Sequence, residues 1–211
     1  RPFDGTSRRC FKMKRQDTVY RIARFVVWVI AKTVFRVKVT GQENIPKDGS
    51  LLVCANHSSN WDPVFLVSAI PPKRAVRYMA KEELFKIPAL KQLMIAAGTY
   101  PVGRGQGDRQ ALKRTIELLN SDETVGIFPE GTRSAPGEFT SAQPGVGFFA
   151  LRSTAQILPI AIIGSYRPFK RMHVAIGKPV DISDLRDQRG AAKSISDRIM
   201  DEIKSVYFNH A

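Results

Sequence analysis

Residues 51–70 of the chain read LLVCANHSSNWDPVFLVSAI, and the fold class can be inferred outward from them. The apolar run Leu51–Ala55 is short and bounded by polar residues, as expected of a buried β-strand. After a polar turn, Pro63 opens a second apolar run to Ile70, which predicts a short helix with Asp62 near its N-cap. A strand that leads directly into a helix is the repeating unit of an α/β fold.

The same alternation continues through the rest of the chain, whose 211 residues suffice for one domain with its own core. Further strands are predicted at Val37–Thr40, Val76–Ala80, Thr99–Val102, Thr124–Phe128, Gln156–Gly164 and Arg171–Gly177. Helices are predicted at Lys81–Ala97, Asp108–Asn120 and Gly145–Ser153 and within Ile182–Tyr207. We therefore expect a single α/β domain over residues 37–211, with a largely parallel central sheet flanked by helices.

Positive charge is concentrated at the N-terminal end of the chain. Lys and Arg number 33 against 19 Asp and Glu, which gives a net charge of +14. Residues 1–40 hold eleven of the basic residues and two of the acidic ones, so they supply nine of the fourteen net charges. A local excess of this kind predicts a polyanionic partner, either nucleic acid or an anionic membrane surface.

The segment Thr18–Phe35 favours the membrane, because it is helix-length, lacks Gly and Pro, and is rich in large apolar residues. On a helical wheel the basic residues at and near this helix fall within an arc of roughly 120°; they are Arg21, Arg24, Lys32 and Arg36. Nucleic-acid binders rarely present so much aliphatic surface, so no nucleic-acid partner is expected. Residues 1–36 are predicted to be a basic amphipathic membrane-docking segment. The alternative is a terminal helix that packs on the core and has a basic outer edge.

The rest of the composition constrains the location of the protein. No stretch approaches the roughly 20 apolar residues that a membrane-spanning helix needs. The two cysteines, Cys10 and Cys54, are too few for a disulfide framework in a chain of this size. We expect a peripheral protein on the cytoplasmic face of the cell membrane.

Of the three histidines, only His57 follows a buried strand and precedes a helix. This is the position at which α/β sheets place ligand-binding groups. Asp62 lies five residues further on, and the two side chains can converge if a turn separates the strand from the helix. A carboxylate on one imidazole nitrogen raises the basicity of the other, and such a pair deprotonates a hydroxyl. The alternative is that Asp62 only caps the helix.

Two more polar strings follow predicted strands: GTYPVGR at residues 98–104 and FPEGTRS at residues 128–134. Arg104 and Arg133 offer planar forks of donors that suit phosphate, while Gly131 lets backbone N–H groups approach an anion. Glu130 is expected to hold Arg133 or to accept a hydrogen bond from a substrate hydroxyl. Two arginines beside a His–Asp base favour a substrate with a phosphate and a hydroxyl, although an isolated Arg usually forms a surface salt bridge.

These strings, together with ILPIAI at residues 157–162, closely resemble the motifs of the glycerophospholipid acyltransferase family, particularly the 1-acylglycerol-3-phosphate (lysophosphatidate) acyltransferases. The resemblance covers Val37 to Gly177 in the motif order of that family. It implies transfer of a fatty acyl chain from a thioester, acyl-CoA or acyl carrier protein, to the free hydroxyl of lysophosphatidate. The product is phosphatidate, an intermediate of phospholipid biosynthesis.

The resemblance also implies roles for individual residues. His57 is the general base, and Asp62 orients it. The residues expected to bind the glycerol phosphate of the acceptor are Arg104, Glu130, Gly131, Thr132 and Arg133. Pro159 is expected to shape the wall of the site or the acyl pocket. No metal or other cofactor is expected, and no acyl-enzyme is required, in agreement with the lack of a Gly-x-Ser-x-Gly nucleophile elbow.

One departure leaves the acceptor open. Many family members carry Lys-x-Gly after the third motif, whereas this chain has Gln143-Pro144-Gly145. Another lysolipid or a glycolipid therefore remains a possible acceptor. Two other classes also stay open: a thioesterase or lipase that uses His57 on water, and a non-enzymatic basic module that binds membrane or nucleic acid.

A group of basic residues at the edges of predicted strands is a candidate site for the donor. It would take up the phosphates of coenzyme A or the acidic face of an acyl carrier protein, unless it only makes the surface soluble. The group comprises Lys73, Arg74, Arg77 and Lys81.

Overall fold

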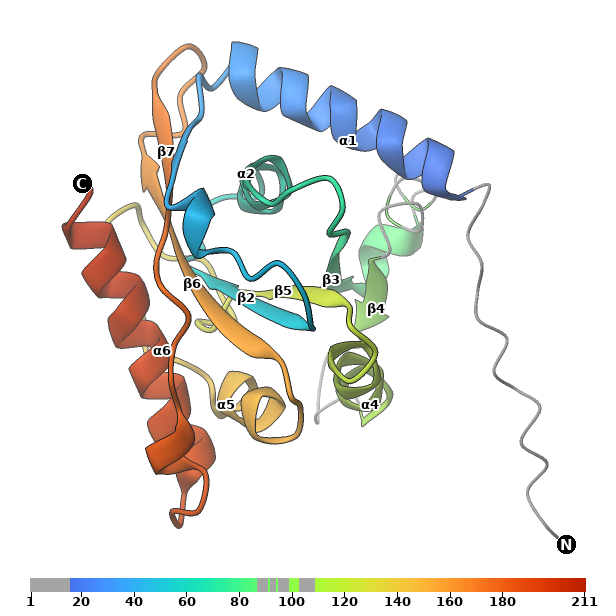
Figure 1. Cartoon of the computed structure of the whole chain (residues 1–211). Helices are drawn as coiled ribbons and strands as arrows, with labels where there is room; N and C mark the ends of the chain where they lie inside the picture. Colours follow the sequence, from blue (N-terminus) through green and yellow to red (C-terminus); the bar gives the residue numbers. More distant parts are fainter. Residues whose placement is uncertain (1–15, 87–90, 92–93, 95–98, 103–108) are drawn as a thin grey trace, which may run out of the picture.

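A seven-stranded sheet forms the centre of the computed structural model, in the strand order β1-β7-β6-β2-β5-β3-β4 (Figure 1). The structure describes residues 16–86, 91, 94, 99–102 and 109–211. The strands are β1 Lys38–Thr40, β2 Leu51–Ala55, β3 Val76–Lys81, β4 Tyr100–Val102, β5 Thr124–Ile127, β6 Gln156–Gly164 and β7 Met172–Ile176. Every neighbouring pair is parallel except β6 and β7. The predicted strands and the largely parallel sheet are thus confirmed.

Helices cover both faces of the sheet (Figure 1). One face carries α1 and α2, and the opposite face carries α4, α5 and α6. The α-helices are α1 Gln16–Thr33, α2 Asp62–Ala69, α4 Arg109–Leu119, α5 Pro144–Leu151 and α6 Ala191–Phe208, and the 3₁₀ turns are η1 Gln42–Asn44, η2 Glu82–Lys86 and η3 Ser183–Leu185. Of the helical region predicted at Lys81–Ala97, η2 is described, and much of the remainder lies outside the described residues.

Burial on both faces explains why β2 is a continuous apolar run. All five of its residues are fully buried. Leu51, Val53 and Ala55 point into the core under α1 and α2, whereas Leu52 and Cys54 point into the core under α4, α5 and α6. The central strand is therefore fixed in register by two separate cores, and the loop that follows it has a firm base.

The N-terminal helix α1 packs on this domain as part of it. Ala31 and Phe35 are buried in the same core as α2. Arg24, predicted to face lipid headgroups with the other basic residues, is instead buried, and its guanidinium donates to the carbonyl oxygen of Ile70 at the end of α2. That prediction was wrong for Arg24, because the carbonyl groups at a helix C-terminus attract a cation.

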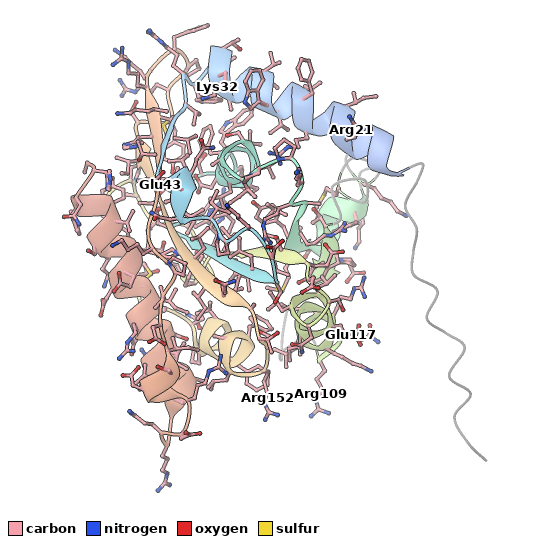
Figure 2. All side chains as sticks on the ribbon, viewed as in Figure 1. Arg21, Lys32, Glu43, Arg109, Glu117 and Arg152 are labelled. Carbon is pink, nitrogen blue, oxygen red and sulfur yellow. The ribbon has the colours of Figure 1, made fainter. Side chains whose placement is uncertain are left out.

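The outer surface of α1 is largely apolar. Exposed large side chains along it are Ile22, Phe25, Val26 and Trp28. Arg21 and Lys32, labelled on α1 in Figure 2, are exposed as well. Within the described residues, no helix is both long and apolar enough to cross a membrane.

Candidate active site

The loops that follow β2 and β5 meet at one edge of the sheet, because the two strands are parallel neighbours. The chain leaves β2 toward α2 on one face, and it leaves β5 toward α5 on the other face. Ligands of α/β sheets bind in the crevice at such a switch point, outside the carboxyl ends of the strands. His57 follows β2 at this point, and Glu130 follows β5.

The side chains of His57 and Asp62 meet at this edge. His57 Nδ1 and Asp62 Oδ2 are 2.8 Å apart. The same carboxylate oxygen accepts the backbone N–H groups of Ser58 and Ser59, each at 2.7 Å. Asp62 is the fully buried first residue of α2, where backbone donors and the helix dipole favour a negative charge. The predicted convergence of the two side chains is thus confirmed.

The contact defines the chemistry available to the imidazole. Oδ2 of Asp62 accepts a hydrogen bond from Nδ1–H of His57, which leaves the lone pair on Nε2 free. The His57 ring stacks on Phe128, with centroids 4.1 Å apart and an interplanar angle of 16°. The side chain is 19% exposed, so a small molecule can approach a ring that is held on two sides. An imidazole in this arrangement is able to take a proton from a hydroxyl that reaches Nε2.

Glu130 links the two loops. Its Oε1 accepts the backbone N–H of His57 at 3.0 Å, and its Oε2 accepts the hydroxyl of Ser134 at 2.9 Å. The backbone N–H and the hydroxyl of Thr140 donate to the same Oε2, each at 3.0 Å. Glu130 is 1% exposed, and the protein itself supplies donors to both of its oxygens. The expectation that Glu130 holds Arg133 is therefore corrected, because Glu130 fixes the backbone of His57 and Arg133 bonds Asn60 instead. Binding of the acceptor by Glu130 stays a prediction.

Arg133 lies beside the His57–Asp62 loop. Its Nη1 donates to Oδ1 of Asn60 at 2.9 Å, and the side chain is exposed. Asn60 is neutral, so this contact positions the guanidinium without cancelling its charge. Gly131 has a φ of 68°, a left-handed conformation that suits glycine, and both Gly131 and Thr132 are exposed. Arg104 lies outside the described residues.

Pro159 lies on the far face of the sheet. It pairs with Cys54 of β2, and its ring approaches Gly177 together with Val206 of α6. The side chains of α2, which holds Asp62, pack on the opposite face. The prediction that Pro159 forms a wall of the site is therefore corrected: it packs the core under α6.

Two of the basic residues predicted to bind the donor are at the other edge of the sheet. Arg74 donates to the carbonyl oxygens of Gly49 and Pro46, which precede β2, each at 2.8 Å. Arg77 pairs with Glu123, which precedes β5, at 3.1 Å. Both arginines bind groups at the amino ends of the strands, whereas the His57–Asp62 pair lies at the carboxyl ends. The side chain of Lys81 lies outside the described part of the structure.

The sequence did not predict several residues that support the site. Asn56 is buried and exchanges two hydrogen bonds with the backbone of Ile162 in β6, at 2.8 and 3.0 Å. Its position directly before His57 was the only available signal. Thr140 and Tyr166 belong to no motif, and no periodicity marked them. Among the described residues, no group of three or more His, Cys, Asp or Glu could hold a metal ion.

Replacing Glu130 by Gln should destabilise the protein and slow turnover. The backbone N–H of His57 meets one carboxylate oxygen and that of Thr140 meets the other. Either orientation of the amide therefore sets its NH2 group against a buried donor, at a cost of about 1–3 kcal/mol. The free energy of unfolding in urea reports the loss of stability, and the turnover rate reports the displacement of His57.

The matched control is Glu138→Gln, because Glu138 is an exposed carboxylate of the same loop. We expect it to be as stable and as active as the wild type. Equal stability of the two variants would show that Glu130 does not link the loops.

Comparison with known proteins agrees with this geometry. The sequence profile of the Acyltransferase family matches residues 36–163, which include the His57–Asp62 pair and the Glu130 loop. A 1-acyl-sn-glycerol-3-phosphate acyltransferase of Bacillus subtilis is 31% identical over 171 residues, which cover 79% of this chain and 84% of the relative. The Saccharomyces cerevisiae enzyme of the same name is 29% identical, over 87% of this chain and 68% of its own length.

A solved structure supports the fold. The crystal structure of a 1-acyl-sn-glycerophosphate (LPA) acyltransferase from Thermotoga maritima superimposes with a TM-score of 0.66, at 24% identity, over 90% of this chain and 78% of the other. The profile covers more than half of the sequence, and the bacterial relative is matched over most of its length. The chain therefore belongs to the acyltransferase family.

Proposed function

We propose that the protein is a 1-acylglycerol-3-phosphate O-acyltransferase, which moves a fatty acyl group from acyl-CoA or acyl carrier protein to the free hydroxyl of lysophosphatidate. The contact between His57 Nδ1 and Asp62 Oδ2, with Arg133 on the adjoining loop, is the observation that carries the proposal. The names of the relatives from Bacillus and Saccharomyces support this choice of acceptor.

The chemistry needs only the two substrates and this pair. Nε2 of His57 takes the proton of the acceptor hydroxyl while the hydroxyl oxygen attacks the thioester carbonyl carbon. The tetrahedral intermediate then collapses, the C–S bond breaks, and the imidazolium gives its proton to the departing thiolate. Asp62 stabilises the imidazolium between the two steps. An ester and a free thiol result, with no acyl-enzyme and no cofactor beyond the thioester co-substrate.

Arg133 is the proposed partner of the acceptor's phosphate. Its guanidinium is exposed and held by a neutral amide, so it keeps its charge for a ligand. Arg104 is proposed as a second contact, and the backbone N–H of the exposed residue Thr132 as a third, because the N–H of Gly131 already donates to the carbonyl of Phe128 at 3.1 Å. Gln143 lies against Gly131, at the place where the family often has a lysine, so the phosphate site depends more heavily on Arg133.

The apolar outer surface of α1 is the proposed membrane contact, with Arg21 and Lys32 beside it for anionic headgroups. Two more exposed aromatic residues lie at the C-terminal end of α1. Trp61 packs on Phe35 with ring centroids 5.1 Å apart, and the N–H of Phe169 donates to the carbonyl of Val34 at 2.6 Å. A lysolipid would then enter without leaving the membrane, on the cytoplasmic face of the cell membrane, where thioester donors are present.

Substitutions in the His–Asp pair test the reaction. We expect His57→Ala to abolish transfer and Asp62→Asn to lower kcat by about 100-fold or more, because the imidazolium loses its counter-charge. The assay follows a labelled acyl-CoA with lysophosphatidate and without acceptor. His210→Ala, at an exposed position near the C-terminus, is the control and should keep full activity.

Turnover by His57→Ala at the control rate would refute the base assignment. Acyl release by the wild type at the same rate without acceptor would identify a thioesterase instead.

Removing the charge of Arg133 tests the acceptor. Arg133→Ala should raise the KM for lysophosphatidate by about tenfold or more and leave the KM for a neutral monoacylglycerol unchanged, because a charge-assisted contact is lost. Arg189→Ala, an exposed arginine in the loop before α6, is the control. Equal KM values for the two variants would move phosphate recognition elsewhere.

A charge on the outer surface of α1 tests docking. Phe25 is 63% exposed, and Phe25→Glu should lower the fraction bound to phosphatidylglycerol vesicles by about tenfold, because the inserted ring is lost. Turnover of detergent-dispersed substrate should persist. The control is Phe208→Glu in α6, at a ring that is 65% exposed. Equal loss of vesicle binding by both variants would contradict docking through α1.

A further inference from the structure

Three buried polar atoms around the His57–Asp62 pair have no hydrogen-bond partner among the described residues. They are Oδ1 of Asp62, Oγ of Ser58 and the phenol oxygen of Tyr166. A buried polar group without a hydrogen-bond partner destabilises the fold, so such groups are rare in folded proteins. Three such atoms around the carboxylate of Asp62 indicate that they hydrogen-bond to one another in the working site.

The fold brings Tyr166 to the pair from a separate strand. Tyr166 follows β6, which is parallel to β2, so it lies at the same edge of the sheet as His57. Its ring lies beside Phe65 of α2, with centroids 6.0 Å apart, and its backbone N–H donates to Sδ of Met172 at 3.4 Å. These contacts hold the ring against the helix that begins with Asp62.

The backbone at Tyr166 is strained. Its φ of 55° lies in the left-handed region, which is unfavourable for a residue with a large side chain. A conformation of this kind is destabilising and persists only where its surroundings impose it. The strained turn after β6 places the ring of Tyr166 beside Phe65 of α2, so this placement of the side chain is itself destabilising.

The phenol remains a donor at every working pH. Burial raises the pKa of Tyr166 well above its usual range, and the negative charge of Asp62 raises it further. The nearby hydroxyl of Ser58 acts in the opposite sense, as expected of a group placed to donate to the phenol oxygen. Asp62 and Tyr207 are the titratable groups that act on the phenol, and His57 acts on the same carboxylate.

We propose that Tyr166 is a positioning residue of the proposed reaction, which donates from its phenol to Oδ1 of Asp62 while Ser58 donates to the phenol. Oδ2 of Asp62 already accepts three donors, and Oδ1 accepts none. The phenol completes the set, so that the carboxylate cannot rotate when the imidazolium forms. It also draws part of the negative charge away from His57 and thereby sets the basicity of Nε2. This inference rests on the function proposed above.

The test is Tyr166→Phe, which removes one oxygen atom and keeps the ring. We expect kcat to fall about tenfold with the KM for lysophosphatidate unchanged. Without the hydrogen bond from the phenol, the carboxylate of Asp62 keeps more negative charge at Oδ2, the oxygen that contacts His57. This charge stabilises the imidazolium form of His57. The acidic limb of the kcat/KM profile should therefore move to higher pH, by roughly half a unit. The matched control is Tyr100→Phe, which removes a phenol oxygen that bonds the hydroxyl of Thr115 instead, and it should change neither quantity.

Replacement of Tyr166 by 3-fluorotyrosine should shift the acidic limb of the kcat/KM profile in the opposite direction. It also provides a second test if the Phe variant does not fold. The fluorinated phenol is a stronger donor, so the acidic limb should move to lower pH. An unchanged limb in either variant, in an enzyme whose wild type transfers acyl groups and whose His57→Ala variant does not, would overturn the role of Tyr166 alone. A wild type without transfer activity would overturn the proposed function instead.

Discussion

The site depends on one buried carboxylate, that of Asp62 at the first residue of α2. Its Oδ2 accepts the imidazole N–H of His57 and the backbone N–H groups of Ser58 and Ser59. Residues five apart on a continuous helix diverge by roughly 140°, so the pair can meet only if the chain turns between them. The two backbone donors make that turn. The same carboxylate that closes the loop also fixes the tautomer of His57, the proposed base, so local folding and the proposed chemistry share one interaction.

A second buried carboxylate joins this turn to the rest of the sheet. Glu130 follows β5 and accepts the backbone N–H of His57, and the carbonyl of His57 accepts the N–H of Ser134 in return at 2.9 Å. The two loops leave the sheet toward opposite faces, and these hydrogen bonds join them where they leave β2 and β5. The imidazole of His57 and the exposed guanidinium of Arg133 are the groups that we propose for contact with substrates. The two buried carboxylates, in contrast, bind groups of the protein itself.

Much of the fold follows from the sequence, because buried parallel strands are apolar runs bounded by turn residues. Leu51–Ala55 and Gln156–Gly164 are strands with the predicted bounds. The His–Asp pair was also predictable from its place after a strand. The roles of Glu130, Pro159 and Arg24 were not, because each depends on a partner distant in sequence. Burial of a carboxylate depends on donors ten residues away, and the face that a strand proline occupies depends on how β2 and β6 pair. Neither the burial of Glu130 nor the face on which Pro159 lies produces a periodic pattern in the sequence.

The tautomer of His57 decides whether this account of the site holds. Nitrogen-15 NMR of the imidazole, in full-length protein at a pH where the ring is neutral, reports directly which nitrogen carries the proton. The geometry requires a protonated Nδ1 and an unprotonated Nε2, because Asp62 Oδ2 lies 2.8 Å from Nδ1. A ring with its proton on Nε2 would contradict the account, since that nitrogen could not then take the proton of an acceptor hydroxyl.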